Sequence, residues 1–293
     1  MKASRFSIRM CNSVSEATDM LTQLNDAKVL AGGQSLIPLM NQRLAKPANL
    51  VDVNNIAELR RIDVSETGVT IGASTRQSAV EKSAEVQAVL PVVPAALSHV
   101  GHPQVRNRGT VVGSICQGDA AAEIPAVLAA VGGTITVAGP SGRREIEVAD
   151  LYADGASRPI KPDELATAVT FNRLKPGSGW SFQEVTRRKY GVAIVGVVTV
   201  VTVTEGAISD VRIAVHGAGT MNRRVPELEK ALMGADAAEI NSSQEAVLEL
   251  LSPSALTFES DFHASAGYRQ VAARQLVAKG VRTSVRRAAA AAA

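Results

Sequence analysis

Two glycine-bearing segments carry the residues of this chain that are best suited to hold an anionic ligand. Glycine permits positive φ angles and close backbone approach, so successive N–H groups can converge on a phosphate. Hydroxyls in both segments would add donors. Two such segments favour a shared diphosphate ligand, whereas a single glycine pair is more often ordinary turn material. The segments are Val29-Leu30-Ala31-Gly32-Gly33-Gln34-Ser35-Leu36 and Arg108-Gly109-Thr110-Val111-Val112-Gly113-Ser114.

Acidic residues follow the second segment at a distance that suits a ribose. Asp119 and then Glu123 come shortly after Ser114. Carboxylates accept hydrogen bonds from ribose hydroxyls, although capping of the helix that follows explains Asp119 slightly better. Neither glycine segment is a GxGxxG fingerprint or a GxxxxGK[ST] loop. The residue types alone therefore support a nucleotide cofactor only as one interpretation.

Covalent and metal-dependent chemistry has little support in the sequence. Cys11 and Cys116 are far apart, and two thiols cannot ligate an iron–sulfur cluster or a structural zinc ion by themselves. There is no GxSxG elbow and no nucleophile with a paired base. His102, beside the second segment, could contact a cofactor or be satisfied by backbone groups. The other three histidines are interpreted as structural or surface residues: His99, His216 and His263.

Composition excludes several function classes. Aromatic residues make up 3% of the chain, which leaves no row of rings for base stacking, and the net charge of +3 is spread without a basic cluster. We therefore expect no nucleic-acid binding. The first ten residues lack the apolar core of a signal peptide, and the longest apolar run, at 192–203, is too short to span a bilayer. The expected protein is cytoplasmic, with two free thiols.

The elements expected around the two segments are short strands and helices. Both segments are expected to leave apolar strands, the first of them at 28–31, and a helix is expected at 123–131 after the second. A looser stretch near 170–178 indicates two domains of α+β type. Further helices are expected at 15–25 with Ser15 as N-cap, at 38–44, at 77–82, at 90–100, at 225–232 and at 264–281. Further strands are expected at 49–53, 68–71, 133–137, 144–147, 192–203 and 208–215, with a hairpin turn at Glu205-Gly206.

Longer stretches around both segments resemble the FAD subunits of the xanthine dehydrogenase and carbon monoxide dehydrogenase family. AGGQSLIPLMNQRLAKPANLVDVNNIAEL resembles the first flavin loop of that family, and GHPQVRNRGTVVGSICQGDAAAEIPAVL resembles the second. The resemblance continues through PDEL at 162–165, FQEVTRRKYGVAIVG at 182–196 and YRQVAARQL at 268–276. It therefore covers nearly the whole chain, in order and at family-like spacing.

The resemblance implies a fold, a cofactor and a set of contacts. The fold is α+β, with an N-terminal FAD-binding domain of the vanillyl-alcohol-oxidase type at 1–172 and a smaller C-terminal α+β flavoprotein domain at 178–287, before a poly-alanine tail at 288–293. FAD is the implied cofactor of this chain. The residues implied to contact FAD are Val29, Leu30, Ala31, Gly32, Gly33, Gln34, Ser35, Leu36, Val100, Thr110, Val111, Val112, Gly113, Ser114, Glu123, Ala166 and Gln183.

The chain departs from the family pattern at three places. The family usually has a glycine pair where this chain has Val112-Gly113, and Asp-Pro where Asp119-Ala120 stands. After Arg187-Arg188 the family often shows Asp followed by an aromatic residue near the flavin, whereas here the run is Lys189-Tyr190-Gly191. Shielding of the flavin ring by Tyr190 is therefore left open, and so is the electron acceptor. The two arginines are as compatible with a solvated pair as with a role beside the flavin.

The resemblance also implies a function that depends on partners. A large subunit would carry a molybdopterin-type molybdenum cofactor and hydroxylate the substrate, and a small subunit would carry two [2Fe–2S] clusters. Electrons would pass to FAD on this chain and then to an external acceptor, within a dimer of heterotrimers. The substrate would be chosen by the large subunit. Two alternatives stay open: a stand-alone flavin oxidoreductase acting on a small molecule, and a non-catalytic protein that has lost FAD.

Overall fold

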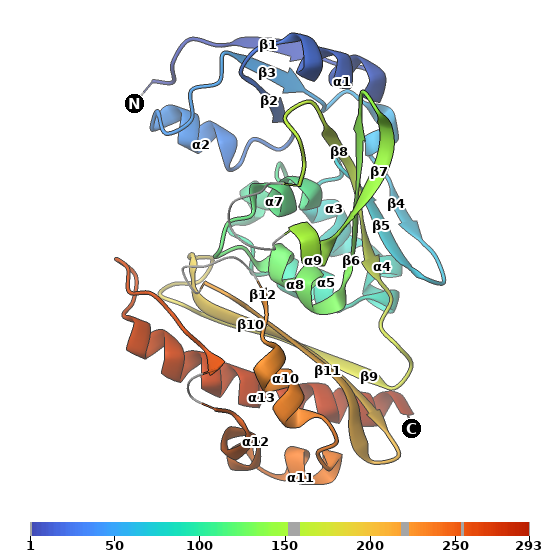
Figure 1. The fold of residues 1–293 in the computed structure, drawn as a ribbon, viewed down its shortest axis with the longest axis vertical. Coiled ribbons are helices and arrows are strands. Elements are labelled where there is room, and N and C mark those ends of the chain that lie inside the picture. Colours follow the sequence, from blue (N-terminus) through green and yellow to red (C-terminus); the bar gives the residue numbers. More distant parts are fainter. Residues whose placement is uncertain (1, 152–158, 218–222, 253–254, 293) are drawn as a thin grey trace. The chain divides into compact units, whose positions relative to one another are not determined.

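The chain folds into two compact units, each assembled from segments that are not contiguous in sequence (Figure 1). The computed structural model describes residues 2–151, 159–217, 223–252 and 255–292. The first unit comprises Met1–Ala88, His102–Gln117 and Gly132–Asn172, and the second comprises Val89–Gly101, Gly118–Val131 and Arg173–Ala293. Two helices that precede residue 172, α5 (Val92–Leu97) and α8 (Glu123–Val131), therefore belong with the C-terminal strands.

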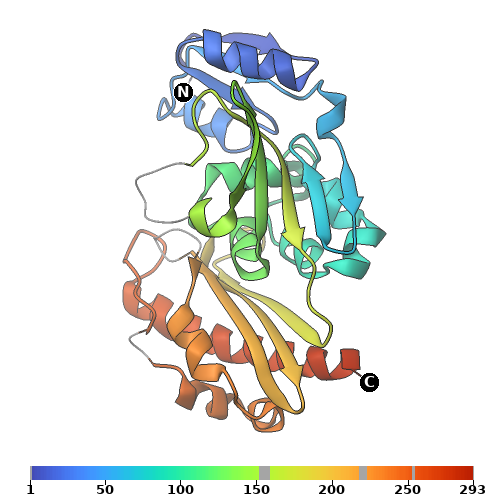
Figure 2. The same cartoon turned by 45° about the vertical axis from the view of Figure 1, so that its right-hand side comes forward.

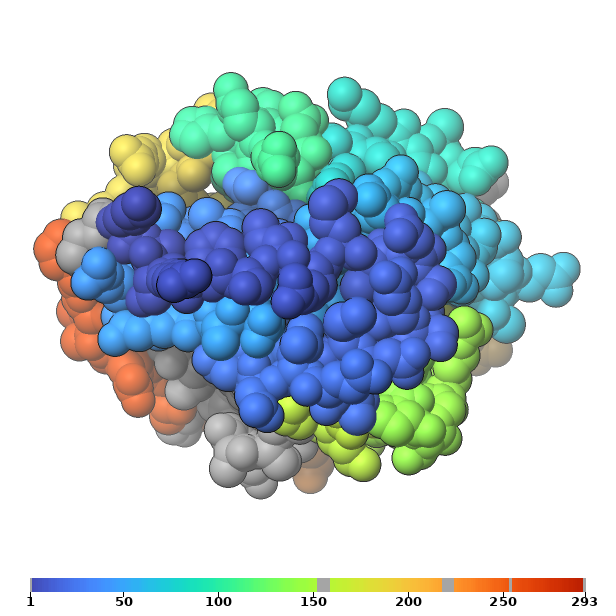
Figure 3. Space-filling model, turned by 90° about the horizontal axis from the view of Figure 1, so that it is seen from above, coloured from blue at the N-terminus to red at the C-terminus, as the bar shows by residue number. Residues whose placement is uncertain are grey.

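A small parallel sheet in the order β1-β3-β2 opens the first unit. Its elements are β1 (Ser7–Met10), α1 (Val14–Gln23), β2 (Ala27–Leu30), α2 (Leu36–Asn41) and β3 (Asn49–Asp52). Parallel neighbours need crossover connections, which α1 and α2 supply. Strand β1 is exposed at the edge, and the N-terminal segment that carries it lies in blue across the face seen in Figure 3.

Helix α1 begins two residues earlier than the sequence predicts. Its N-cap is Ser13, whose Oγ accepts the N–H of Glu16 at 3.1 Å. The expected cap at Ser15 is wrong, because burial of Val14 draws that residue into the first turn and leaves Ser15 inside the helix. Helix α2 matches the expected helical turn, two to three residues early.

An antiparallel sheet in the order β4-β5-β8-β6-β7 forms the rest of the first unit's framework (Figure 2). Val169 of the central strand β8 lies opposite Ile71 of β5 and Ile135 of β6, and none of the three is exposed. The elements are η1 (Ala57–Leu59), β4 (Ile62–Val64), β5 (Gly68–Gly72), α3 (Gln77–Lys82), α4 (Ala84–Val89), α6 (Pro103–Arg106), α7 (Val111–Gln117), β6 (Gly133–Gly139), β7 (Gly142–Glu147), α9 (Val148–Leu151) and β8 (Leu165–Asn172).

The second unit is a four-stranded antiparallel sheet in the order β12-β11-β10-β9, with helices on both faces. Helices α5 and α8 lie on one face, and α10, α12 and α13 lie on the other (Figure 1). Glu205 and Gly206 both have positive φ, as a two-residue hairpin turn between β10 and β11 requires. The elements are β9 (Ser178–Thr186), β10 (Ala193–Thr204), β11 (Ala207–His216), β12 (Arg223–Arg224), α10 (Pro226–Leu232), α11 (Ala237–Ser242), α12 (Gln244–Leu250) and α13 (Ala266–Ala292).

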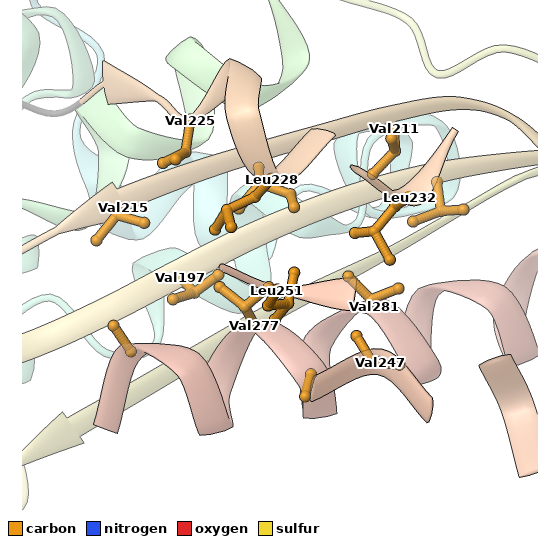
Figure 4. Packing of buried hydrophobic residues seen from close by; sticks show 14 of the residues in the cluster. Val197, Val211, Val215, Val225, Leu228, Leu232, Val247, Leu251, Val277 and Val281 are labelled. Atoms are coloured by element: carbon orange, nitrogen blue, oxygen red, sulfur yellow. The ribbon is translucent and has the colours of Figure 1, made fainter. Parts of the chain in front are cut away.

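The core of the second unit is almost entirely aliphatic, as the low aromatic content requires. Alternate residues of β10, including Val197 and Val201, pack against Val277 and Val281 of α13 (Figure 4). Helix α13 continues to Ala292, and Ala288 is buried, so the alanine tail extends this packed helix. None of the helices in the described ranges is both long and apolar enough to cross a bilayer.

Candidate functional site

The first glycine segment lies between β2 and α2 and packs against the second segment backbone to backbone. A Cβ atom added to Gly32 would come within 2.7 Å of the Gly109 Cα and 3.0 Å of the Arg108 carbonyl carbon. Only glycine fits at Gly32. Gly33 has a φ of +70°, which turns the chain toward α2. The structure therefore brings the two segments together within the first unit.

Three consecutive backbone N–H groups of the first segment are available to a ligand. The N–H groups of Ile37 and Leu39 bond back to the carbonyls of Gly33 and Ser35. Within the described part of the chain, the N–H groups of Gly33, Gln34 and Ser35 donate to no acceptor, and these residues are half-buried or exposed. Converging free donors of this kind suit an anion such as a diphosphate.

The second segment is a helix start rather than a glycine-rich loop. It follows helix α6, so the expectation that it leaves an apolar strand is wrong. Thr110 is buried, and its Oγ1 accepts the N–H of Gly113 at 3.1 Å at the beginning of α7. Val112 is buried inside α7 and needs no special φ, so the missing family glycine does not disturb the backbone here. Gly113 and Ser114 likewise lie within this helix.

Asn54 and Arg76 join the two segments, and sequence reasoning missed both. The Arg76 guanidinium donates to the Arg108 carbonyl at 2.7 Å and to Oδ1 of Asn54 at 2.8 Å. Asn54 Nδ2 in turn donates to the Ala31 carbonyl at 2.9 Å. Each residue stands just outside a strand or helix, where a polar side chain has no distinctive sequence signal. We call Asn54 and Arg76 the bridge.

Positive charge gathers around the bridge. Arg60 donates to the Asn54 carbonyl, and Arg108 lies close enough to Arg76 to act on its charge. Burial lowers the pKa of the Arg76 guanidinium, and Arg108 and Arg60 lower that pKa further, while Asp52 acts in the opposite sense. Clustered guanidinium groups attract an anionic ligand. The free N–H groups and this charge together fit the diphosphate of a dinucleotide.

The remaining cofactor candidates are divided between the units. Ala166 lies on β8 of the first unit and is buried. Val100, Glu123 and Gln183 belong to the second unit. The Nε2 of Gln183 donates to the Ser181 hydroxyl at 2.9 Å, on the same face of β9.

Glu123 is the first residue of α8 and is buried. Burial raises the pKa of its carboxyl to about 8, an effect that the charge of Glu184 reinforces and that of His99 opposes. Glu123 is therefore a neutral acid at pH 7, able to donate as well as accept a hydrogen bond. Asp119 accepts the N–H of Ala121 at 2.9 Å. It caps a turn before α8 rather than the helix itself.

The residues near the implied flavin ring have local partners. Arg187 donates to the His263 carbonyl at 2.7 Å, which ties the β9–β10 loop to the segment before α13. Tyr190 has a φ of +64°, and the Lys189 ammonium lies 5.0 Å from its ring centre. His102 precedes α6 at the N-cap position without a side-chain capping bond. A role for Tyr190 over the flavin stays a prediction.

We find no group of described side chains arranged for nucleophilic or metal-dependent catalysis. In the ranges that the structure describes, no three His, Cys, Asp or Glu side chains could share a metal ion, and Cys11 and Cys116 are free thiols. Main-chain donors and arginine charge in this arrangement suit an anionic ligand.

Two protein-family models match the chain. The model described as the FAD binding domain in molybdopterin dehydrogenase matches residues 4–172, and the CO dehydrogenase flavoprotein C-terminal domain matches residues 180–284. The two models together span both units.

Named relatives agree with these matches. The nicotine 6-hydroxylase medium subunit of Paenarthrobacter nicotinovorans is 37% identical over 92% of this chain and 93% of its own. The carbon monoxide dehydrogenase medium chain of Hydrogenophaga pseudoflava is 32% identical over 94% of this chain and 96% of its own.

Solved structures have the same fold. Carbon monoxide dehydrogenase from Hydrogenophaga pseudoflava superposes with a TM-score of 0.90 at 32% identity, over 98% of this chain and 99% of that one. Quinoline 2-oxidoreductase from Pseudomonas putida 86 gives a TM-score of 0.88 at 30% identity, over the same shares of the two chains.

Proposed function

Because the chain belongs to the family of FAD-binding subunits of molybdopterin dehydrogenases, we propose that it relays electrons through FAD in a molybdenum hydroxylase. The family resemblance found in the sequence is confirmed, and so are the mixed helix-and-strand, two-domain fold and the assignment to an oxidoreductase subunit. In this proposal the electrons come from [2Fe–2S] clusters of a partner subunit and leave to an external acceptor.

The observation that carries the proposal is the row of free N–H groups at Gly33, Gln34 and Ser35. These groups lie beside the second segment, which can approach the first only because position 32 is glycine. The arginines around the bridge are close by. We assign the diphosphate of FAD to these donors. The second segment from Thr110 to Ser114 is proposed to support the same group from its helix start.

When bound, FAD would supply the capacity to accept and release electrons. The protein's own residues perform the remaining tasks. Main-chain donors and arginine charge fix the diphosphate, and the bridge holds the two segments at a constant spacing. The remaining candidates in the second unit, including Glu123 with its neutral carboxyl, are proposed to contact other parts of the cofactor.

Partners follow from the family. Relatives are named as medium subunits or chains of nicotine 6-hydroxylase and carbon monoxide dehydrogenase. We propose a large molybdopterin subunit and a small iron–sulfur subunit for this chain, assembled as a dimer of heterotrimers. A cytoplasmic location stays a prediction. The substrate would be selected on the large subunit.

The proposal is tested on the full chain co-purified with its neighbouring subunits. Denaturation should release one FAD per chain, and Gly33→Val should abolish this yield because position 33 requires positive φ and its Cβ would lie 3.1 Å from Ile37. Gly142→Val is the matched control, since Gly142 also has positive φ but has open space around it. Full FAD content in the Gly33→Val protein would refute the assignment of this segment.

Electron relay is tested separately by anaerobic reduction. Substrate should bleach the flavin absorbance in the intact assembly but not in the isolated, flavin-loaded chain. Bleaching of the isolated chain by an organic substrate would favour a stand-alone flavin oxidoreductase instead.

A further inference from the structure

Three residues of the second unit lie side by side across the sheet. In the strand register, Gly196 of β10 pairs with Glu184 of β9 on one side and with His216 of β11 on the other. Directly opposed residues in an antiparallel sheet present their side chains on the same face. A Cβ on Gly196 would overlap the His216 ring, coming within 2.8 Å of its Cδ2 atom. The imidazole therefore lies over Gly196, in the direction of Glu184.

The other edge of the His216 ring holds the chain just before α8. His216 is fully buried, and its Nδ1 lies 3.2 Å from the Ala121 carbonyl. A carbonyl can only accept, so Nδ1 carries the hydrogen. The N–H of Gly217 donates to the Ala120 carbonyl at 2.7 Å. The end of β11 thus fixes residues 120–121, two positions before Glu123.

With its hydrogen on Nδ1, a neutral His216 presents a lone pair at Nε2. That atom and Oε2 of Glu184 are both buried and have no hydrogen-bond partner in the described chain. Among the described residues, each of these two atoms is therefore a buried acceptor without a donor. Oε1 of Glu184 lies 3.5 Å from Nδ1 of His99, whose side chain is 43% exposed, so His99 connects the pair to solvent.

Packing fixes the position of these groups. The Phe182 ring lies between the two imidazoles, 5.0 Å from His99 and 5.6 Å from His216 between ring centres. Glu123 is the other titratable group that acts on the cluster, and Asp119 acts in turn on Glu123. Burial lowers the pKa of His216, and hydrogen bonding to Glu184 raises that of His99. The outer histidine therefore takes up a proton more readily than the inner one.

We propose that His216 is a positioning residue for the flavin site, which holds the turn before Glu123 through its Nδ1. This inference rests on the proposed function, because Glu123 is assigned to FAD there. Loss of the Nδ1 donor would leave the Ala121 carbonyl without this hydrogen bond and loosen residues 120–121. FAD should therefore bind more weakly when the imidazole is replaced by an apolar ring.

Two substitutions separate this role from general stability. His216→Phe keeps an aromatic ring beside Phe182 but loses the Nδ1 donor, and FAD affinity should fall about tenfold, the usual effect of one buried hydrogen bond. His216→Asn, whose amide can occupy the Nδ1 position, should recover most of that loss. His263→Asn is the control histidine.

The experiment titrates deflavinated full chain with FAD and follows flavin fluorescence, with thermal unfolding of the flavin-free protein in parallel. Equal FAD affinity in wild type and in a folded His216→Phe protein would overturn the inference, as would an equal loss of affinity in His216→Asn and His216→Phe. If the wild type binds no FAD, the proposed function fails instead. Nitrogen NMR of His216 then still decides the local arrangement, since a hydrogen on Nε2 and none on Nδ1 would contradict it.

Discussion

Replacing Gly32 by alanine tests the contact between the two glycine segments. The new Cβ would lie 2.7 Å from the Gly109 Cα and 3.0 Å from the Arg108 carbonyl carbon, whereas ordinary contacts begin near 3.4 Å. Both neighbours are backbone atoms and cannot rotate away. The Arg108 carbonyl oxygen is nearer still, so the segments must separate by roughly 1 Å, which also stretches the hydrogen bonds of the bridge at Asn54 and Arg76.

The cost can be estimated from overpacking. Forcing one extra methyl group into a tightly packed site usually costs about 1–3 kcal/mol. If this strain acts on the bound geometry, the Kd for FAD should rise about 5- to 150-fold. The assay is FAD titration of the deflavinated chain, with urea unfolding of the flavin-free protein to measure any loss of stability. Gly267→Ala is the matched control, because Gly267 has open space around its Cα.

A Gly32→Ala protein that binds FAD within twofold of wild type and unfolds at the same urea concentration would refute this prediction. That result would mean that the two segments tolerate separation, and that their close packing has no part in cofactor binding.

Three further predictions address other parts of the structure. Arg76→Met removes the hydrogen bonds to Arg108 and Asn54 together with a positive charge, so FAD affinity should fall at least tenfold. Arg76→Lys should be intermediate. Equal salt dependence of FAD binding in the wild type and both variants would contradict this prediction. The folded pKa of Glu123, about 8, lies above its ordinary value of 4.5, so its contribution to stability is complete below pH 4.5 and is lost as the pH rises through 8. Glu123→Gln should therefore lose less thermal stability than wild type between pH 5 and 9, and parallel Tm curves for the flavin-free proteins would refute the assignment. Arg269→Met should lower the free energy of unfolding by about 3 kcal/mol in urea, because the buried guanidinium bonds the carbonyls of Ile194, Glu259 and Ala264. A change below about 0.5 kcal/mol would show that these carbonyls find other donors.

Elements with a strong local signal could be predicted from sequence. The apolar run from Glu123 to Val131 gave the bounds of α8, and Glu205-Gly206 gave the hairpin turn, because turn chemistry and continuous burial act within a few residues. The first glycine segment was placed correctly after a strand for the same reason.

Features that depend on distant partners could not be predicted. Strand β8 was missed because its pairing partners, β5 and β6, lie far away in sequence. Helix α7 was interpreted as a glycine-rich loop because Gly113 and two valines lower its helix propensity, whereas burial of those valines decides the matter. Asn54 and Arg76 gave no signal, since nothing local shows that Asn54 reaches the Ala31 carbonyl while Arg76 reaches the Arg108 carbonyl.

We assign the diphosphate of FAD to main-chain donors of the first glycine segment. A density map of the intact, flavin-loaded assembly that resolves phosphate oxygens would test this assignment. Diphosphate oxygens should lie within hydrogen-bond distance of the N–H groups of Gly33, Gln34 and Ser35. A dinucleotide bound elsewhere, with these three groups facing only water, would contradict the assignment.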